Sequence, residues 1–342
     1  MSHFLQAARH QPVDVTPVWL MRQAGRSLPE YRKLRERWSL VEIVAQPELC
    51  AEVTLQPVRR LGVDAAVMFA DIMLPLRGMG VEFELVEDVG PVIARPIASA
   101  ADVERLTVPA GEAAAPQVIT AVRQVVAQSP VPVIGFCGAP FTLASYLIEG
   151  RPSRDFAKAK AFMYSEPVAF DSLLAKLAAT MAGYLLAQVE AGVSAVQLFD
   201  SWVGALAVED YEVRVLPHTR SIFDALKSAG VPRIHFGTDT AGLLESIAAT
   251  GPDIVSVDWR MPLDAAWGRV GHDRGIQGNL DPAVLLGPPE LVRERARDVL
   301  RRAAGRPGHI FNLGHGVLPS TPLENLQVLI ETVHEWQVAR VA

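Results

Sequence analysis

Two arginines in an open turn are the first residues of this chain that could bind a ligand. Arg22 and Arg26 follow an apolar run, and Gln23, Ala24 and Gly25 separate them. A guanidinium stays charged and binds a carboxylate through two parallel hydrogen bonds. Because alanine and glycine leave room for a ligand, this turn favours an anion site. The alternative is a pair of solvated surface charges.

Four polar residues farther along the chain could belong to the same site. Asp71 lies within an apolar run, as a site carboxylate or as the N-cap of a following helix. His315 stands between two glycines, which packing hardly explains and which favours a functional role. For Tyr146 a core tyrosine with a satisfied hydroxyl is the commoner outcome, and Ser201 could equally cap the next helix. For Asp71, Tyr146 and Ser201 both alternatives stay open.

Several common catalytic groups are missing from the sequence. No lysine ends a predicted strand, which argues against Schiff-base chemistry. We find neither a glycine-rich phosphate loop nor the G-x-S-x-G turn of an esterase. There is no H-E-x-x-H motif, and Cys50 and Cys137 lie far apart. We therefore expect chemistry without a metal or an organic cofactor.

The elements that would position these residues alternate between short apolar runs and longer amphipathic stretches. Continuous apolar runs are typical of parallel strands buried on both faces. Eight such strands, alternating with helices, predict a single (β/α)8 TIM-type barrel rather than the runner-up, a doubly wound open sheet. The eight predicted strands are Pro17–Met21, Ala65–Ala70, Val131–Cys137, Ala195–Phe199, Arg233–Gly237, Asp253–Trp259, Gly275–Leu280 and His309–Leu313.

The segments between the strands predict helices and one insertion. Four helices stand out by their pattern, and we expect them over Pro167–Ala191, Val208–Ala229, Pro289–Ala304 and Pro322–Val338. All but Val208–Ala229 have proline at their first residue, which is a helix-start signal. The segment Val81–Pro96 alternates in polarity and carries turn residues. It predicts a β-hairpin inserted after the second strand.

The polar candidates fall where such a barrel holds its chemistry, at the carboxyl ends of the strands. Arg22 to Arg26 follow the first predicted strand, and Asp71 follows the second. Ser201 and His315 follow the fourth and the eighth. We expect these groups to converge on one mouth, whereas Asp258 and Asp281 are expected to be structural loop and cap residues.

The composition limits the class of protein further. The net charge is −6 without a basic run, which argues against nucleic acid as a partner. No apolar run approaches the roughly 20 residues of a membrane span, and the first 15 residues do not resemble an export signal. Two cysteines fit a reducing compartment. We expect a cytoplasmic protein with a single domain over residues 1–342.

Six blocks of the sequence resemble the uroporphyrinogen decarboxylase family, in the family's order and across nearly the whole chain. The first and the last of them are highly specific. The blocks are PVWLMRQAGRSLPEYR from Pro17 to Arg32, FADI from Phe69 to Ile72, GAPFTLASYLIEG from Gly138 to Gly150, FDSW from Phe199 to Trp202, GNLDP from Gly278 to Pro282 and NLGHGVLP from Asn312 to Pro319.

The resemblance implies a distorted (β/α)8 barrel, usually a homodimer, that decarboxylates the four acetate arms of uroporphyrinogen III without a cofactor. It implies that Arg22, Gln23, Ala24, Gly25 and Arg26 line the substrate, with both guanidiniums on carboxylates. Asp71 matches the family's central catalytic aspartate. Three further matches are a substrate-contacting tyrosine, a small hydroxyl residue and a histidine, at Tyr146, Ser201 and His315. Tyr31 and Arg35 match positions near the cleft.

Two positions depart from the commonest family pattern, and two other functions stay open. Ser27 stands where a tyrosine is usual, and Ser201 where many bacterial members have threonine. Zinc- and corrinoid-dependent methyltransferases share the superfamily's barrel but need a His-x-Cys thiolate, and here Gly237 follows His235-Phe236. A non-catalytic tetrapyrrole-binding protein is the other alternative, against which the retained Arg22, Arg26 and Asp71 argue.

Overall fold

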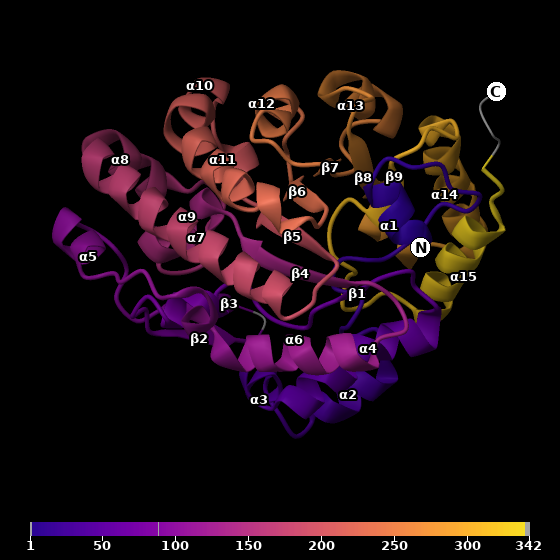
Figure 1. Cartoon of the computed structure of the whole chain (residues 1–342), viewed down its shortest axis with the longest axis horizontal. Coiled ribbons are helices and arrows are strands. Elements are labelled where there is room, and N and C mark those ends of the chain that lie inside the picture. The colour runs from indigo at the N-terminus through magenta and orange to yellow at the C-terminus, as the bar shows by residue number, and fades with distance from the viewer. Residues whose placement is uncertain (1, 88, 339–342) are drawn as a thin grey trace.

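A curled parallel sheet forms the centre of the protein. The computed structural model describes residues 2–87 and 89–338. Seven parallel strands lie in the order β1-β4-β5-β6-β7-β8-β9 (Figure 1). Their bounds are β1 Ala66–Val67, β4 Val133–Gly138, β5 Ala195–Asp200, β6 Arg233–Gly237, β7 Ile254–Ser256, β8 Gly275–Leu280 and β9 His309–Leu313. The strand order follows the chain without reversal, so the doubly wound alternative is wrong.

A hydrogen bond across the concave face of the sheet shows how strongly it curls. The Gln277 side chain on β8 donates from Nε2 to Oε1 of Gln197 on β5 at 2.9 Å. In a flat sheet these strands, three positions apart, would be about 14 Å from each other. Trp19 adds a bond from its indole N–H to Oε1 of Gln277 at 3.0 Å. The N-terminal segment therefore reaches the same interior as the middle strands.

The first predicted strand, Pro17–Met21, is not a regular strand but lies where one is expected. Val18 forms an isolated parallel bridge with Phe311 of β9. On its other side, the Asp64 N–H donates to the Val18 carbonyl and the Val18 N–H to Asp64 Oδ2, both at 2.8 Å. A side chain thus replaces a ladder partner, and Pro17 has no N–H to donate. The segment spans the gap between β9 and the residues before β1.

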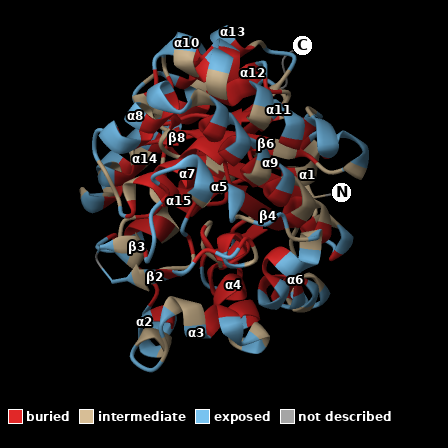
Figure 2. Ribbon diagram, turned by 90° about the vertical axis from the view of Figure 1, so that its left-hand side faces the viewer, coloured by how far each residue is buried: buried red, intermediate tan, exposed pale blue. Residues whose placement is uncertain are grey.

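Helices form an outer layer, and Figure 2 shows their exposed faces turned away from the buried centre. The α-helices are α1 His3–Ala8, α2 Pro29–Arg35, α3 Leu40–Ala45, α4 Pro47–Leu61, α5 Ala100–Glu104, α6 Pro116–Gln128, α7 Pro140–Glu149, α8 Ala157–Ser165, α9 Pro167–Glu190, α10 Val208–Asp210, α11 Leu216–Ala225, α12 Leu244–Ala248, α13 Leu263–Val270, α14 Pro289–Ala303 and α15 Leu323–Glu335. Three of the four helix predictions, those for α9, α14 and α15, are confirmed within a few residues.

The fourth predicted helix, Val208–Ala229, is interrupted. After α10 the chain makes a π-helical turn over Tyr211–Val215 before α11. Pro217 explains the break, because it has no N–H and its ring crowds the preceding turn. A helical period in the sequence did not reveal this irregularity.

The predicted hairpin is confirmed and is joined to α7. Strands β2 Phe83–Val86 and β3 Gly90–Ile93 pair antiparallel. The Ile93 N–H donates to the Gly150 carbonyl at 2.8 Å, just beyond the end of α7. The hairpin is thereby held beside the helix that carries Tyr146.

One helix has the composition of a membrane span. Among the described residues, α9 is 24 residues long with a mean hydropathy of 1.3 over its most apolar window. That window is 61% buried inside the protein, and α9 packs against α7, α11 and β4. Such burial is typical of a core helix.

Candidate active site

Arg22 lies on the backbone of the loop that carries His315. A Cβ built on Gly316 would meet the Arg22 Cδ at 2.4 Å, so glycine is needed there. The Val317 N–H donates to the Met21 carbonyl at 2.8 Å and ties the two loops together. Arg22 itself has a left-handed backbone, with φ of 60°. Such conformations are uncommon outside glycine and concentrate at functional sites.

The buried side chain of Gln23 stabilises this turn through hydrogen bonds to the backbone. Its side chain is buried, accepting the Leu20 N–H and donating to the Ala65 carbonyl, both at 3.0 Å. The turn is thereby joined to the start of β1. A direct contact of Gln23 with a ligand stays a prediction, as do those of the half-buried Ala24 and Gly25.

Asp71 lies four residues beyond β1 and is half-buried. Its Oδ1 accepts the Met73 N–H at 2.9 Å, so one oxygen also stabilises a local turn. Burial raises the pKa of Asp71, while the Met73 hydrogen bond and the positive charge of Arg22 lower it, with a net rise. The positive charge of Arg22 is therefore near enough to Asp71 to act on its ionisation.

Tyr146 lies on α7 on the same side of the molecule as Asp71 and Arg22. Its ring meets the edge of Trp202 with centroids 6.0 Å apart. Burial raises the pKa of Tyr146, a hydrogen bond with Trp202 lowers it, the Asp71 charge raises it and the Arg22 charge lowers it. The hydroxyl is therefore exposed to the fields of both charged residues and is not an isolated core group.

His315 is neutral at physiological pH. Its pKa is lowered to about 4, chiefly by burial and by the positive charge of Arg22; the Asp258 charge opposes this and the Arg260 charge adds to it. Its Nδ1 accepts the Gly316 N–H at 2.7 Å. The neutral ring leaves Nε2 to carry the proton, so that His315 can donate a hydrogen bond from Nε2.

Ser201 directly follows β5, whose end is held in place by a buried network of hydrogen bonds. Asp200 is fully buried and accepts the Thr142 hydroxyl at 2.8 Å, and that hydroxyl accepts the Trp202 N–H at 3.2 Å. The helix-cap alternative for Ser201 is wrong, since the short helical turn after it has Trp202 as its N-cap. Thr142 and Trp202 lie within matched blocks at the predicted strand ends, and the structure adds them to the candidates of the site.

Arg26 points toward the hairpin. Its Nη2 lies 2.9 Å from Oε1 of Glu87, at the turn between β2 and β3. Arg35 approaches the other oxygen of Glu87 at 3.5 Å and donates from Nη1 to the Tyr31 hydroxyl at 3.0 Å. In the described structure Arg26 thus already holds a carboxylate, as its residue type predicts, but one from this chain.

The two expected structural aspartates are confirmed. Asp281 accepts the Ala283 N–H at 2.9 Å as the N-cap of a short helical turn. Asp258 is buried and accepts the backbone N–H groups of Asp239 at 2.6 Å and Arg260 at 3.0 Å. It holds together the loops after β6 and β7, beside His315.

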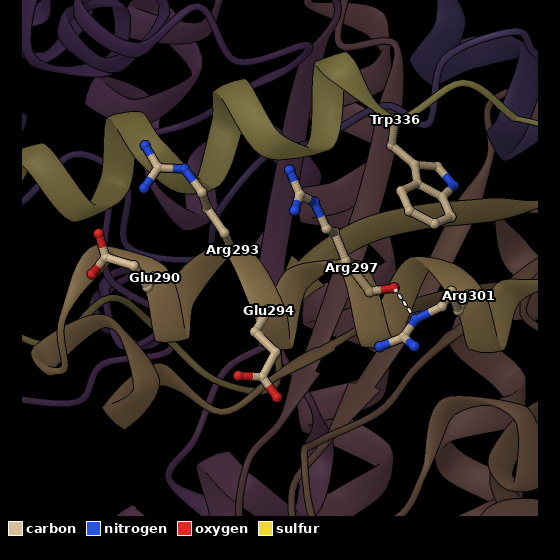
Figure 3. A pocket seen from close by; sticks show the side chains of 6 residues that line it. All are labelled: Glu290, Arg293, Glu294, Arg297, Arg301 and Trp336. Atoms are coloured by element: carbon tan, nitrogen blue, oxygen red, sulfur yellow. Dashed lines mark hydrogen bonds between the residues drawn. The ribbon is translucent and has the colours of Figure 1, made fainter.

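Two surface hollows lie away from these residues. One, of about 510 Å³, runs along α14 and is lined by Glu290, Arg293, Glu294, Arg297, Arg301 and Trp336 (Figure 3). The other, of about 670 Å³, includes His309, which is the first residue of β9 and so lies at the amino end of the strands. Neither hollow contains Arg22, Asp71, Tyr146 or His315. The candidate site is therefore defined here by the charges and the loop contacts of these residues.

Possible metal ligands are sparse in the described part of the chain. No group of three histidine, cysteine, aspartate or glutamate side chains is close enough to hold a metal ion within residues 2–87 and 89–338. Cys50 and Cys137 are buried, and burial raises the pKa of Cys50 to about 12. His235 is buried and lies 3.6 Å from Asp200. Metal independence of the protein remains a prediction.

The fold and the site define an α/β protein with a cationic, partly desolvated site at the carboxyl ends of its parallel strands. Residues 1–336 match the uroporphyrinogen decarboxylase (URO-D) family, and the chain belongs to this family. The uroporphyrinogen decarboxylase of Carboxydothermus hydrogenoformans is 52% identical over 97% of this chain and 95% of its own. That of Streptomyces coelicolor is 53% identical over 97% of this chain and 94% of its own.

Among solved structures the similarity concerns the fold alone. A methyltransferase from Methanosarcina mazei superposes with a TM-score of 0.81, at 22% identity and 97% coverage of both chains. A B12-independent methionine synthase from Shewanella gives a TM-score of 0.57 at 11% identity, covering 86% of this chain and 89% of its own. The fold is therefore shared with proteins named for methyl transfer.

Proposed function

We propose that this protein decarboxylates the four acetate side chains of uroporphyrinogen III, giving coproporphyrinogen III and carbon dioxide. The observation that carries the proposal is Asp71, a partly desolvated carboxylate whose pKa responds to Arg22. Tyr146 and His315 respond to the same arginine. Family membership and relatives of about 52% identity named for this reaction support the substrate.

Loss of carbon dioxide from an acetate arm leaves an electron pair that needs an acceptor. A pyrrole ring protonated at carbon is cationic and can accept it. A carboxylate held in place beside that ring stabilises the cation and orients the pyrrole N–H groups, which is electrostatic preorganisation. We assign this role to Asp71.

The arginines would bind the substrate's many carboxylates and so position the reacting arm. Arg22 stays charged and is held against Gly316, close to the proposed catalytic carboxylate. Binding energy from arms that do not react can thereby be used to orient the arm that does. Tyr146, Ser201 and the neutral His315 are assigned as hydrogen-bonding groups around the same substrate.

The finer architecture is part of the proposal. We infer a distorted (β/α)8 barrel in which Pro17–Met21 takes the place of the first of the eight strands, supported by its bonds to Phe311 and Asp64. We also propose a single domain over residues 1–342, a homodimer, a cytoplasmic location and no membrane or nucleic-acid partner. The family match over residues 1–336 supports the single domain.

A turnover assay tests the proposed reaction. Purified protein supplied with uroporphyrinogen III should yield products with seven, six, five and finally four carboxylates. Their separation by carboxylate number distinguishes stepwise decarboxylation from mere binding. Tight binding without any loss of carboxylates would instead identify a non-catalytic tetrapyrrole-binding protein.

Exhaustive chelation should leave the decarboxylase activity unchanged. We expect this because Gly237 stands at the position where a methyltransferase of this superfamily needs a thiolate to bind zinc. Activity should be measured before and after dialysis against a chelator, and again after addition of zinc. Loss on chelation with recovery on zinc would overturn the cofactor-free mechanism.

A further inference from the structure

A carboxylate of this chain lies between two arginines of the candidate site. Glu87, at the turn of the β2–β3 hairpin, is 2.9 Å from Arg26 and 3.5 Å from Arg35, with a different oxygen facing each. The Glu87 side chain is 60% exposed, against 38% for Arg26 and 20% for Arg35. The arginines are therefore the more enclosed partners, and the carboxylate reaches them from the solvent side.

The arginine pair has donor capacity beyond Glu87. The Nε of Arg35 is buried and has no hydrogen-bond partner among the residues that the structure describes. A buried N–H without a partner is unfavourable and marks a place where a ligand or water can bind. Nη1 of the same guanidinium donates to the Tyr31 hydroxyl at 3.0 Å, which fixes its orientation.

Aromatic packing connects this pair to the proposed catalytic carboxylate. The Tyr31 ring meets the edge of Phe69 with centroids 5.5 Å apart, and Phe69 precedes Asp71 by two residues. The hairpin is also bonded to Gly150, at the end of the helix that carries Tyr146. The hairpin that carries Glu87 is thus bonded beside α7 through Ile93, while Glu87 itself contacts Arg35 at the end of α2.

We propose that Glu87 occupies a carboxylate position that one of the substrate's own carboxylates takes over when it binds. The inference rests on the proposed function and deepens it, because it makes Glu87 an internal competitor for the Arg26–Arg35 pair. Two guanidiniums this close favour having a carboxylate between them at all times. Glu87 supplies it in the unliganded protein and swings into solvent when the ligand arrives.

An internal competitor has a simple energetic effect. A tethered carboxylate acts at a high effective concentration, so small anions at ordinary concentration displace it poorly. A ligand already anchored at Arg22 presents its next carboxylate as an equally local group and can displace Glu87. The cost is a lower apparent affinity, because only the fraction of protein with Glu87 released is competent to bind at this position.

Neutralising Glu87 should therefore strengthen substrate binding. In the whole protein, Glu87→Gln should lower the KM for uroporphyrinogen III roughly threefold to tenfold, the size expected for one or two partly exposed ion pairs, with kcat unchanged within about twofold. Glu84→Gln is the matched control, since Glu84 is exposed on the same hairpin and its loss changes the net charge equally. It should leave KM unchanged.

Variants that combine Glu87→Gln with loss of its arginine partners, together with a binding probe, test whether a substrate carboxylate replaces Glu87. The alternatives are a purely structural ion pair and a long-range charge effect. In a background that lacks both guanidiniums, Arg26→Met with Arg35→Met, Glu87→Gln should no longer improve KM. An unchanged or higher KM for Glu87→Gln alone, or an equal gain for Glu84→Gln, would overturn the proposal in favour of a structural ion pair or a long-range charge effect. Fluorescence titration with uroporphyrin III, an octacarboxylate that cannot react, should show the same gain in affinity and tests the exchange even if the wild-type protein shows no turnover.

Discussion

Asp71→Asn should bind the tetrapyrrole product normally but turn substrate over roughly 100-fold more slowly, a loss of about 3 kcal/mol of transition-state stabilisation. Asparagine keeps the size of the side chain and removes the charge that would face the cationic pyrrole. Asp71→Glu keeps the charge but displaces it by one methylene, so intermediate activity is expected. Both kcat and product affinity should be measured on the same preparations.

The local turn provides the competing explanation, and the variant separates the two. Asp71 accepts the Met73 N–H through Oδ1, a bond that the asparagine carbonyl can also accept. Folding stability should therefore change little in Asp71→Asn while kcat falls. A lower melting temperature with normal turnover by the folded fraction would instead mean that Asp71 only stabilises the turn, and near-normal kcat would remove it from the mechanism.

The pH dependence gives a second readout of the same group. Burial raises the pKa of Asp71 above its ordinary value of 3.8, against the opposing effects of Met73 and Arg22. If the carboxylate is the working form, activity falls as the pH drops through this raised pKa, so the acidic limb of the kcat/KM profile, which reports the free protein, should lie above 3.8. That limb should be absent in Asp71→Asn. Because the folded pKa is raised, this group's contribution to folding stability is present at low pH and lost as the pH rises through it.

Arg22→Ala should reduce kcat/KM by about 2–5 kcal/mol, the range for truncating one partner of a desolvated charge pair. Lysine should rescue it poorly, since a single ammonium cannot form two parallel hydrogen bonds with a carboxylate. The substitution also removes a positive charge that lowers the pKa values of Asp71, Tyr146 and His315. The acidic limb of the pH profile should therefore move to higher pH in Arg22→Ala.

A matched arginine controls for loss of charge alone. Arg37 is exposed just beyond α2, and Arg37→Ala should leave kcat/KM unchanged. Arg26→Ala should cost less than Arg22→Ala, because Glu87 already shares the Arg26 charge. Wild-type kinetics in Arg22→Ala would mean that this arginine is a surface charge, despite its position over Gly316.

Local sequence was sufficient for much of the fold. The bounds of β6, β8 and β9 agree with the predictions, and all residues of β8 and β9 are buried, as is typical of parallel strands covered on both faces. The hairpin was equally predictable from its alternating polarity. Local pattern could not predict that Pro17–Met21 pairs irregularly or that Pro217 interrupts its helix, because both depend on which backbone partners are available.

The residue types of the site could also be predicted from the sequence, since an arginine pair beside glycine, or a histidine between glycines, is unusual enough to stand out. The contacts among these residues could not be predicted. The Arg22 side chain covers Gly316, 294 residues along the chain, and the Arg26 guanidinium meets Glu87 rather than open solvent. Burial, and with it the direction of each pKa shift, follows from what packs around a group. Only the curling of the sheet, which brings strand ends from the whole chain to one edge, decides those neighbours.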